Sequence, residues 1–189
     1  ILYVFSMSIS AKIESQTVIR YDSPLHKDDI CNDMVIDNFN NIYVIGYSDT
    51  LISTFPIVIY KHRPLLLKYD GKGNLLWYKI ERNITGQFVK IELDSNNHIY
   101  VAGQARIIGN QDNIILFKYN TDGNFIDSSV YSRQNLSGHS LMGLAYHSNR
   151  IILATKDYGS GYTEHYTTLS YDTTLNFKWQ TIFTNNYAV

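Results

Sequence analysis

Apolar and polar residues alternate along much of this chain with a period of two, which is typical of half-buried β-strands. In the first third, the alternation predicts strands over residues 34–37, 41–48, 65–69 and 75–80. The links DNFNN and DGKGN, which precede the second and fourth strands, are rich in residues that tolerate a left-handed backbone. A longer link, residues 49–63, joins the second strand to the third. The pattern therefore predicts four antiparallel strands.

The same arrangement is predicted twice more. Strands are expected over residues 89–94, 99–105, 114–119 and 125–131, and again over 141–146, 151–156, 165–171 and 177–183. The abundant Tyr, Ile, Val and Thr favour strands, and no window shows the 3.6-residue period of an amphipathic helix. The whole chain is predicted to be all-β.

Residue spacing indicates that these units are copies of one repeat. One set recurs at an offset of 57, where Asp37, Tyr43 and Gly46 match Asp94, Tyr100 and Gly103. A second set recurs at an offset of 50, where Tyr69 and Gly73 match Tyr119 and Gly123. A third copy of this second set lies 102 positions after the first, where Tyr171 matches Tyr69 and Trp179 matches Trp77. A chain with such periodicity is expected to form an array of similar small units.

Four short antiparallel strands in a repeat of about 50 residues predict a β-propeller. In this fold, small sheets called blades stack around an axis and cover one another's apolar faces. We expect blades over residues 30–82, 88–132 and 139–183, and half a blade, its two outer strands, over residues 1–21. Since rings need about four blades or more, three and a half blades are expected to be part of a larger ring or assembly.

Two tryptophans occupy the same position of the repeat. Trp77 and Trp179 each lie on the predicted fourth strand of a unit, and we expect them to be wedges between neighbouring blades. The second unit has Asp127 at this position, so one junction is expected to be packed differently.

Composition narrows the range of partners. Sixteen basic against 17 acidic residues give a net charge of −1, which provides no general attraction to nucleic acid or anionic lipid. No run of 18 apolar residues is present, so no membrane-spanning segment is expected in this stretch. The single cysteine, Cys31, excludes an internal disulfide, and its place in a strand-like run predicts a buried, inert thiol.

The chain contains none of the common sequence motifs of catalysis. The chain lacks a Gly-rich phosphate loop, a paired-histidine zinc helix and a nucleophile elbow, and no cofactor is expected. Two metal alternatives remain open. The links on one face of a propeller contain His62, His139, Glu164 and His165, which are metal-ligand types, although ordinary solvated loop residues are the simpler interpretation. The acidic turns offer oxygen ligands for calcium, but Asx turns explain them better because spaced carboxylates are missing.

The same loop face holds the candidate binding residues. Residues 158–166 mix aromatic and small polar side chains, a composition that suits adaptable recognition or, more simply, a flexible link. The candidate binding-face residues are His62, Arg63, Tyr158, Tyr162, Glu164 and His165. Asn83 and Asn135 each begin a glycosylation sequon in a link between blades, and the use of either sequon would require secretion.

The motifs DNFNNIYVIG and KYDGKGNLLW resemble the bacterial and archaeal β-propeller repeats called SBBP, and this resemblance covers nearly the whole chain. It implies a blade fold and a role as an extracellular or cell-surface module, usually without an assigned reaction. The Asp-x-x-Gly-x-x-x-Trp spacing is also similar to the docking motif of quinoprotein dehydrogenase propellers. In those enzymes the motif joins blades and does not bind the cofactor, so it carries no catalysis to this chain.

Two functional hypotheses follow. The first is a non-catalytic propeller module, extracellular or at the cell surface, that binds a protein or glycan through residues 49–63, 106–112 and 158–164, or that serves structural assembly. The alternative is a fragment of a propeller enzyme of quinoprotein or lyase type, with its site near the ring axis. The predicted innermost strands, NDMVID, VKIELD and LMGLAY, have few acids or bases, which favours binding.

Overall fold

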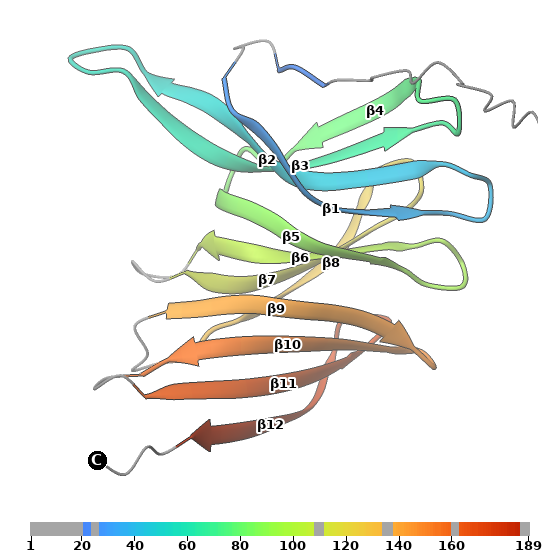
Figure 1. Cartoon of the computed structure of the whole chain (residues 1–189), viewed down its shortest axis with the longest axis vertical. Coiled ribbons are helices and arrows are strands. Elements are labelled where there is room, and N and C mark those ends of the chain that lie inside the picture. Colours follow the sequence, from blue (N-terminus) through green and yellow to red (C-terminus); the bar gives the residue numbers. More distant parts are fainter. Residues whose placement is uncertain (1–20, 24–26, 108–111, 134–137, 160–162, 186–189) are drawn as a thin grey trace, which may run out of the picture.

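Three four-stranded antiparallel sheets form the described part of the chain in a computed structural model (Figure 1). The structure describes residues 21–23, 27–107, 112–133, 138–159 and 163–185. None of these residues lies in a helix, so none forms a helix that could span a membrane. The predicted all-β fold of four-stranded propeller blades is confirmed. The half blade predicted over residues 1–21 lies outside the described residues, except for Tyr21.

In each sheet the strands follow one another in chain order. The first sheet contains β1 (Asp29–Ile36), β2 (Ile42–Ser53), β3 (Ile59–Tyr69) and β4 (Leu75–Ile80). The second contains β5 (Thr85–Leu93), β6 (Ile99–Arg106), β7 (Asn113–Tyr119) and β8 (Phe125–Tyr131). The third contains β9 (Gly138–His147), β10 (Arg150–Tyr158), β11 (Glu164–Asp172) and β12 (Phe177–Asn185). The described strands of different sheets do not pair, so each sheet is open and has two edge strands.

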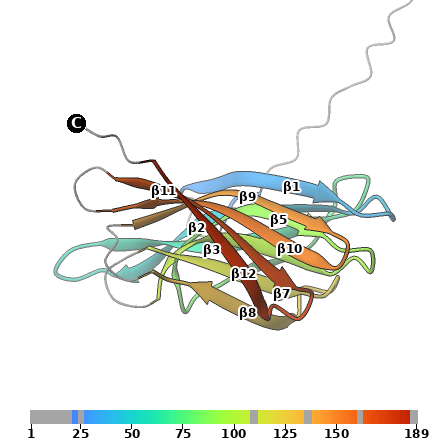
Figure 2. The same ribbon diagram turned by 90° about the horizontal axis from the view of Figure 1, so that it is seen from below.

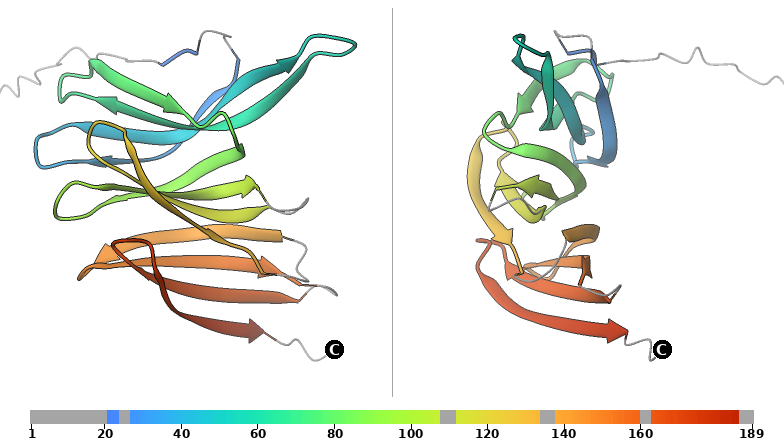
Figure 3. Two further views of the ribbon diagram at one scale, coloured as in Figure 1. Left: turned by 180° about the vertical axis from the view of Figure 1, so that it is seen from behind. Right: turned by 90° about the vertical axis from the view of Figure 1, so that its left-hand side faces the viewer.

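The sheets are stacked face to face in a row, as Figure 1 and Figure 3 show from different sides. We call the face of a sheet that points toward the preceding sheet its leading face, and the opposite face its trailing face. The first junction buries Tyr43, Ile45 and Leu66 of the first sheet against Phe88, Ile99, Val101 and Phe117 of the second. The second junction buries Tyr100, Ala102, Ile114 and Leu116 against Ile151, Leu153, Leu169 and Tyr171. Each inner sheet face is thus covered by its neighbour, as the repeat predicts.

Five of the hairpin turns share one Asx-turn geometry. In each, a side-chain oxygen accepts the backbone N–H groups two and four residues later, at Asp37, Asp70, Asp94, Asn120 and Asp172. The third residue after each has a positive φ between 56° and 86° (Asn40, Gly73, Asn97, Gly123 and Leu175). This geometry explains the recurrent aspartates and glycines, because the carboxylates bind their own backbone.

Gly46 and Gly103 recur because each faces a β-bulge in the neighbouring inner strand. The register of β1 shifts between Cys31 and Asp33, and that of β5 shifts between Phe88 and Lys90. As a result, a Cβ atom on Gly103 would collide with the carbonyl oxygen of Gln87. A bulge that brings backbone this close can tolerate only glycine opposite it.

A Gly103→Ala substitution is expected to lower the free energy of unfolding by about 1–3 kcal/mol, because backbone atoms must move to admit the methyl group. Urea denaturation measures this change. Gly138→Ala is the control, since a Cβ atom there has no neighbour within 4 Å, and its effect is expected to stay within about 0.5 kcal/mol. Equal effects of the two substitutions would contradict the bulge explanation.

The segment over residues 49–63, expected as a link, is largely strand. Ser48 pairs with Arg63 at the position where the second sheet has its last pair, Ala105 with Asn113. In the first sheet, pairing continues to Ser53 and Ile59, and the extended hairpin projects from the stack (Figure 1). The alternating pattern missed this extension because residues 51–62 are exposed except for the half-buried Ser53, so no buried face imposes a period of two.

Candidate functional site

The β2–β3 hairpin, the ends of β6 and β7 and the ends of β10 and β11 lie on the same side of the stack (Figures 1 and 2). This side corresponds to the predicted loop face. Its most prominent feature is the apolar tip of the β2–β3 hairpin, residues 51–60, where Phe55, Ile57 and Val58 have 86%, 66% and 57% of their surface exposed. Large apolar side chains gathered at an exposed tip indicate an interaction surface.

His62 and Arg63 lie at the base of this hairpin and have different surroundings. The His62 ring packs at a tilt against that of Tyr47 with centroids 4.4 Å apart, and its Nδ1 atom is 2.5 Å from Asp49 Oδ1. Arg63 donates hydrogen bonds to the carbonyl oxygen of Ile84 and to Thr50 Oγ1. Arg63 therefore ties the hairpin to the link that follows β4, whereas His62 is more exposed to solvent.

A polar groove separates the hairpin base from the second sheet. It has a volume of about 520 Å³ and is lined by Tyr47, His62, Thr85, Gly86, Gln87, Gln104, Arg106 and Asp112. Its polar groups largely bind protein atoms. Arg106 is 3.0 Å from Asp112, and Gln104 donates to the carbonyl oxygen of His139 at 2.6 Å. Few of its hydrogen-bonding groups are thus free for a ligand.

The candidate residues of the third sheet form a separate group. Glu164 is 2.7 Å from Lys156 Nζ, and His165 Nδ1 is 2.8 Å from Thr184 Oγ1. Lys156 also lies over the ring of Tyr158, 5.3 Å from its centroid. The second sheet separates this group from His62 (Figure 1), so the structure does not gather the candidates into one site. Tyr162 lies outside the described residues.

The two sequons differ in what the structure says of them. Asn83 is exposed in the turn between β4 and β5, while Asn135 lies outside the described residues. The metal alternative gains no support, because the described residues include no group of three or more metal-ligating side chains close enough to share an ion.

The interpretation of His139 as a solvated link residue was wrong, because His139 lies in β9 and is buried with Asp157 in a polar cluster that the sequence did not predict. Both side chains are fully buried, and His139 Nδ1 is 2.9 Å from Asp157 Oδ1. The carboxylate also accepts hydrogen bonds from Thr155, Thr167 and Tyr131. Burial by itself would raise the pKa of Asp157, but the hydrogen bonds from His139, Thr167 and Thr155 hold it below its usual value. The cluster stabilises a carboxylate and joins β8 to the third sheet.

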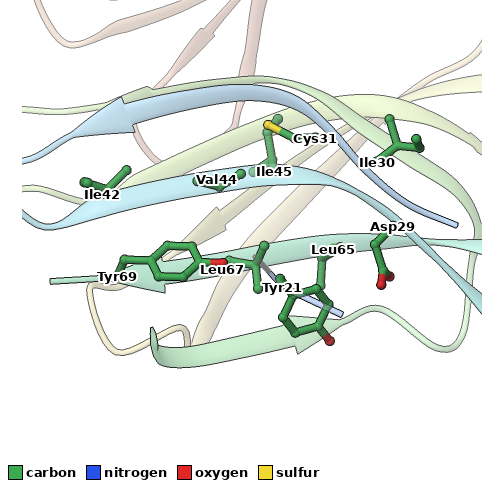
Figure 4. Close-up of a pocket in the computed structure, with 10 residues that line it drawn as sticks. All are labelled: Tyr21, Asp29, Ile30, Cys31, Ile42, Val44, Ile45, Leu65, Leu67 and Tyr69. Carbon is green, nitrogen blue, oxygen red and sulfur yellow. The ribbon is translucent and has the colours of Figure 1, made fainter. Parts of the chain in front are cut away.

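The leading face of the first sheet has no sheet over it among the described residues, and it is hollowed by an apolar pocket of about 300 Å³ (Figure 4). The pocket is lined by residues of β1, β2 and β3 and by Tyr21, whose ring packs 5.4 Å from that of Tyr78. Cys31 lines it as well. The expectation of a buried thiol was wrong, since Cys31 is exposed. It is exposed because no described sheet covers the leading face of the first sheet.

The inner strands bring together three charged residues that the sequence alone did not pair. Lys90 Nζ is 4.0 Å from Asp33 Oδ2, and Asp33 also accepts the backbone N–H of Ile91. Burial, together with the charge of Asp33, raises the pKa of Glu92. This cluster forms because β1 and β5 lie side by side in the stack, and the sequence period does not predict which of their side chains meet.

Comparison with known proteins shows that part of the chain is similar to a known family. Residues 25–52, which contain β1 and nearly all of β2, match the SBBP family, described as a β-propeller repeat. No curated protein matches the chain. The match confirms the SBBP resemblance, and the second and third sheets repeat the four-stranded arrangement of the first. Residues 25–52 are thus similar to an SBBP β-propeller repeat, and the three sheets share one four-stranded arrangement.

Proposed function

We propose that this chain is a non-catalytic β-propeller module that binds a protein partner through the tip of the β2–β3 hairpin. The observation that carries this proposal is the exposure of nine of the ten residues 51–60, on strands that extend beyond the equivalent strands of the second sheet. Four paired positions beyond Ser48 correspond to roughly 13 Å at about 3.3 Å per residue. A projection of this length suits insertion into an apolar groove of another protein.

A protein fits this tip better than a glycan or an anionic membrane. Glycan recognition needs free polar groups, whereas Phe55, Ile57 and Val58 offer none and the polar groove is largely paired internally. A tip that binds an anionic membrane is expected to have an excess of basic residues near it. The hairpin base has Lys61 and Lys27 but also Asp28 and Asp49, so the local charge is mixed.

The binding proposal predicts a result for substitutions at the tip. A photo-crosslinking residue in place of Phe55 identifies the partner, and the affinity of the purified partner is then measured by calorimetry. A Phe55→Ser/Ile57→Ser variant is expected to weaken binding at least tenfold, because each buried apolar side chain contributes about 1.5–3 kcal/mol. Phe39→Ser is the matched control, since Phe39 is 75% exposed at the opposite side of the stack. Equal losses for both variants would refute the assignment.

We also place the module outside the cell or at the cell surface. The SBBP resemblance and the exposure of the Asn83 sequon support this location. The enzyme alternative rests on the cluster of Asp33, Lys90 and Glu92, which lies on inner strands where a propeller axis would run. Asp33 and Lys90 form an ion pair with each other at 4.0 Å, which accounts for both charges without a substrate. The binding function is therefore better supported.

A further inference from the structure

The β2–β3 hairpin is longer than the strands on both sides of it. β1 pairs with β2 only as far as Ser48, and β4 pairs with β3 only as far as Leu65. One further hydrogen bond joins the backbone N–H of Glu81 to the carbonyl oxygen of Pro64 at 2.9 Å, and the chain then turns toward β5. The outer edge of β3 over residues 59–63 therefore has no strand beside it within the described part of the chain.

The backbone groups on this edge follow from the alternation of antiparallel strands, in which residues two positions apart point to the same side. The carbonyl group of Pro64 points toward β4, so the N–H and C=O groups of His62 and Tyr60 point the same way, beyond the end of β4. The carbonyl oxygen of Lys61 points to the other side and accepts from Thr50 of β2 at 3.3 Å. Two N–H and two C=O groups thus lie on an exposed edge without a described strand to pair with.

Such an edge is a template for one more strand, and the charges beside it decide which strand fits. Lys61 is exposed and forms no ion pair with a described residue. Lys27 Nζ, 5.2 Å from the ring centroid of Tyr60, adds a second positive charge, while the carboxylate of Asp49 is bound to His62. An acidic side chain opposite Lys61 would form a cross-strand pair of opposite charge, which stabilises a sheet.

A second copy of this chain fits the edge less well than an acidic strand. If two copies paired around a twofold axis with all four backbone groups of each, Tyr60 would lie opposite His62 and the two Lys61 side chains would face each other. Like charges directly opposite each other destabilise a sheet, and lysine on an edge strand protects many proteins against self-pairing. The charge of the edge therefore selects a different protein.

We propose that the outer edge of β3 binds an extended segment of the partner protein by β-strand addition, and that this segment has an acidic residue opposite Lys61. This inference rests on the proposed function, because it takes the partner to be a protein that meets the hairpin. The backbone groups of Tyr60 and His62 hold the added strand, which continues the line of β4. The exposed apolar side chains of the tip then contact another part of the same partner.

A peptide tests the edge before the partner is known. Acetyl-Thr-Val-Glu-Val-Thr-amide reads the same in both directions, so it can align with β3 in either orientation. In NMR spectra of the whole ¹⁵N-labelled chain, millimolar peptide is expected to shift the amide resonances of Tyr60 and His62. The matched peptide with lysine in place of glutamate is expected to bind about fivefold more weakly, because it brings like charges together at Lys61. A Lys61→Glu variant is expected to reverse this preference.

Proline substitutions separate the backbone of the edge from its side chains. His62→Pro and Tyr60→Pro each remove an N–H group that points away from β2, so the pairing of β2 with β3 keeps its hydrogen bonds. Each is expected to bind the glutamate peptide about fivefold more weakly than the matched alanine variant, which lacks the same side chain but keeps the N–H group. If one proline variant does not fold, the other provides the comparison.

The tip variant Phe55→Ser/Ile57→Ser leaves the edge intact and is expected to bind the peptide as the wild type does. Failure of the tip proposal and failure of this one are therefore distinguishable. The absence of shifts at Tyr60 and His62, equal binding of the two peptides, or equal binding by proline and alanine variants would overturn strand addition with an acidic segment. Concentration-dependent protection of the same two amides in the wild-type chain alone would also overturn it, because a second copy would then be the occupant.

Discussion

Replacing Asp157 by alanine is expected to lower the free energy of unfolding by about 3–5 kcal/mol, because several buried donors would lose their acceptor at once. The Asp157 carboxylate is fully buried and accepts from Thr167 at 2.7 Å and from Thr155 at 3.0 Å, with His139 at 2.9 Å. Alanine would leave these buried donors unpaired, and each unpaired donor costs about 1–3 kcal/mol. The junction of the second and third sheets would lose its polar centre.

Urea denaturation at neutral pH measures this loss, and Asp127→Ala is the control because Asp127 is exposed on β8. The pKa of Asp157 is lowered in the folded chain, so its stabilisation is present above the unfolded value of about 3.9. It disappears as the pH falls through the folded pKa. The difference between wild type and Asp157→Ala should therefore shrink in acid. A loss no larger than that of Asp127→Ala would show that the cluster contributes little.

The fold was predictable because its signals are local. The turn at Asp70 depends on residues within four positions, and the positive φ at Gly73 follows from the same short segment. Three copies of this segment at similar offsets, 50 and 52 positions, then predict three similar sheets. Strand pairing between consecutive strands needs no long-range information, which is why the four-stranded units could be derived from the sequence alone.

The contacts between sheets were not predictable in the same way. Lys68 and Thr121 are 53 positions apart, and Asn32 and Phe88 are 56 positions apart, which is about one repeat. The repeat therefore predicts which sheets are neighbours, but it does not predict which side chains meet between them. The candidate binding residues illustrate the difficulty. His62 and His165 were predicted to lie on one face, and the strands that hold them, β3 and β11, begin on the same side of the stack, yet the second sheet lies between them (Figure 1). The order of the strands predicts on which side of the stack a residue lies, but it does not predict the distances between residues that would form one site.

The two junctions solve the same packing problem with different residues. At the first, the Trp77 indole lies against Gly123, where an added Cβ atom would be 3.2 Å from the ring. At the second, Asp127 replaces the tryptophan and Leu175, the counterpart of Gly123, is 5% exposed within the apolar core. The leucine accepts a φ of 56°, and its burial offsets the strain of a left-handed backbone. A large residue on one side is thus paired with a small one on the other.

A Trp77→Ala substitution is expected to lower the free energy of unfolding by about 3–5 kcal/mol, since deletion of an aromatic ring leaves a cavity. Trp77 packs against the first apolar core, with its ring 6.2 Å from that of Tyr43. Gly123 on the other side has no side chain that could move into the space. The junction between the first and second sheets would lose its wedge, which urea denaturation would detect as a lower midpoint.

Trp179→Ala provides the matched control, because Trp179 occupies the same position of the repeat on β12 but is 46% exposed. No described sheet covers the trailing face of the third sheet, so little of this ring leaves water on folding. Its removal is expected to cost less than about 1.5 kcal/mol, within the ordinary range for a partly exposed side chain. If both tryptophans gave the same loss, the stabilisation would come from contacts within each sheet, and the wedge between blades would not explain why the residue recurs.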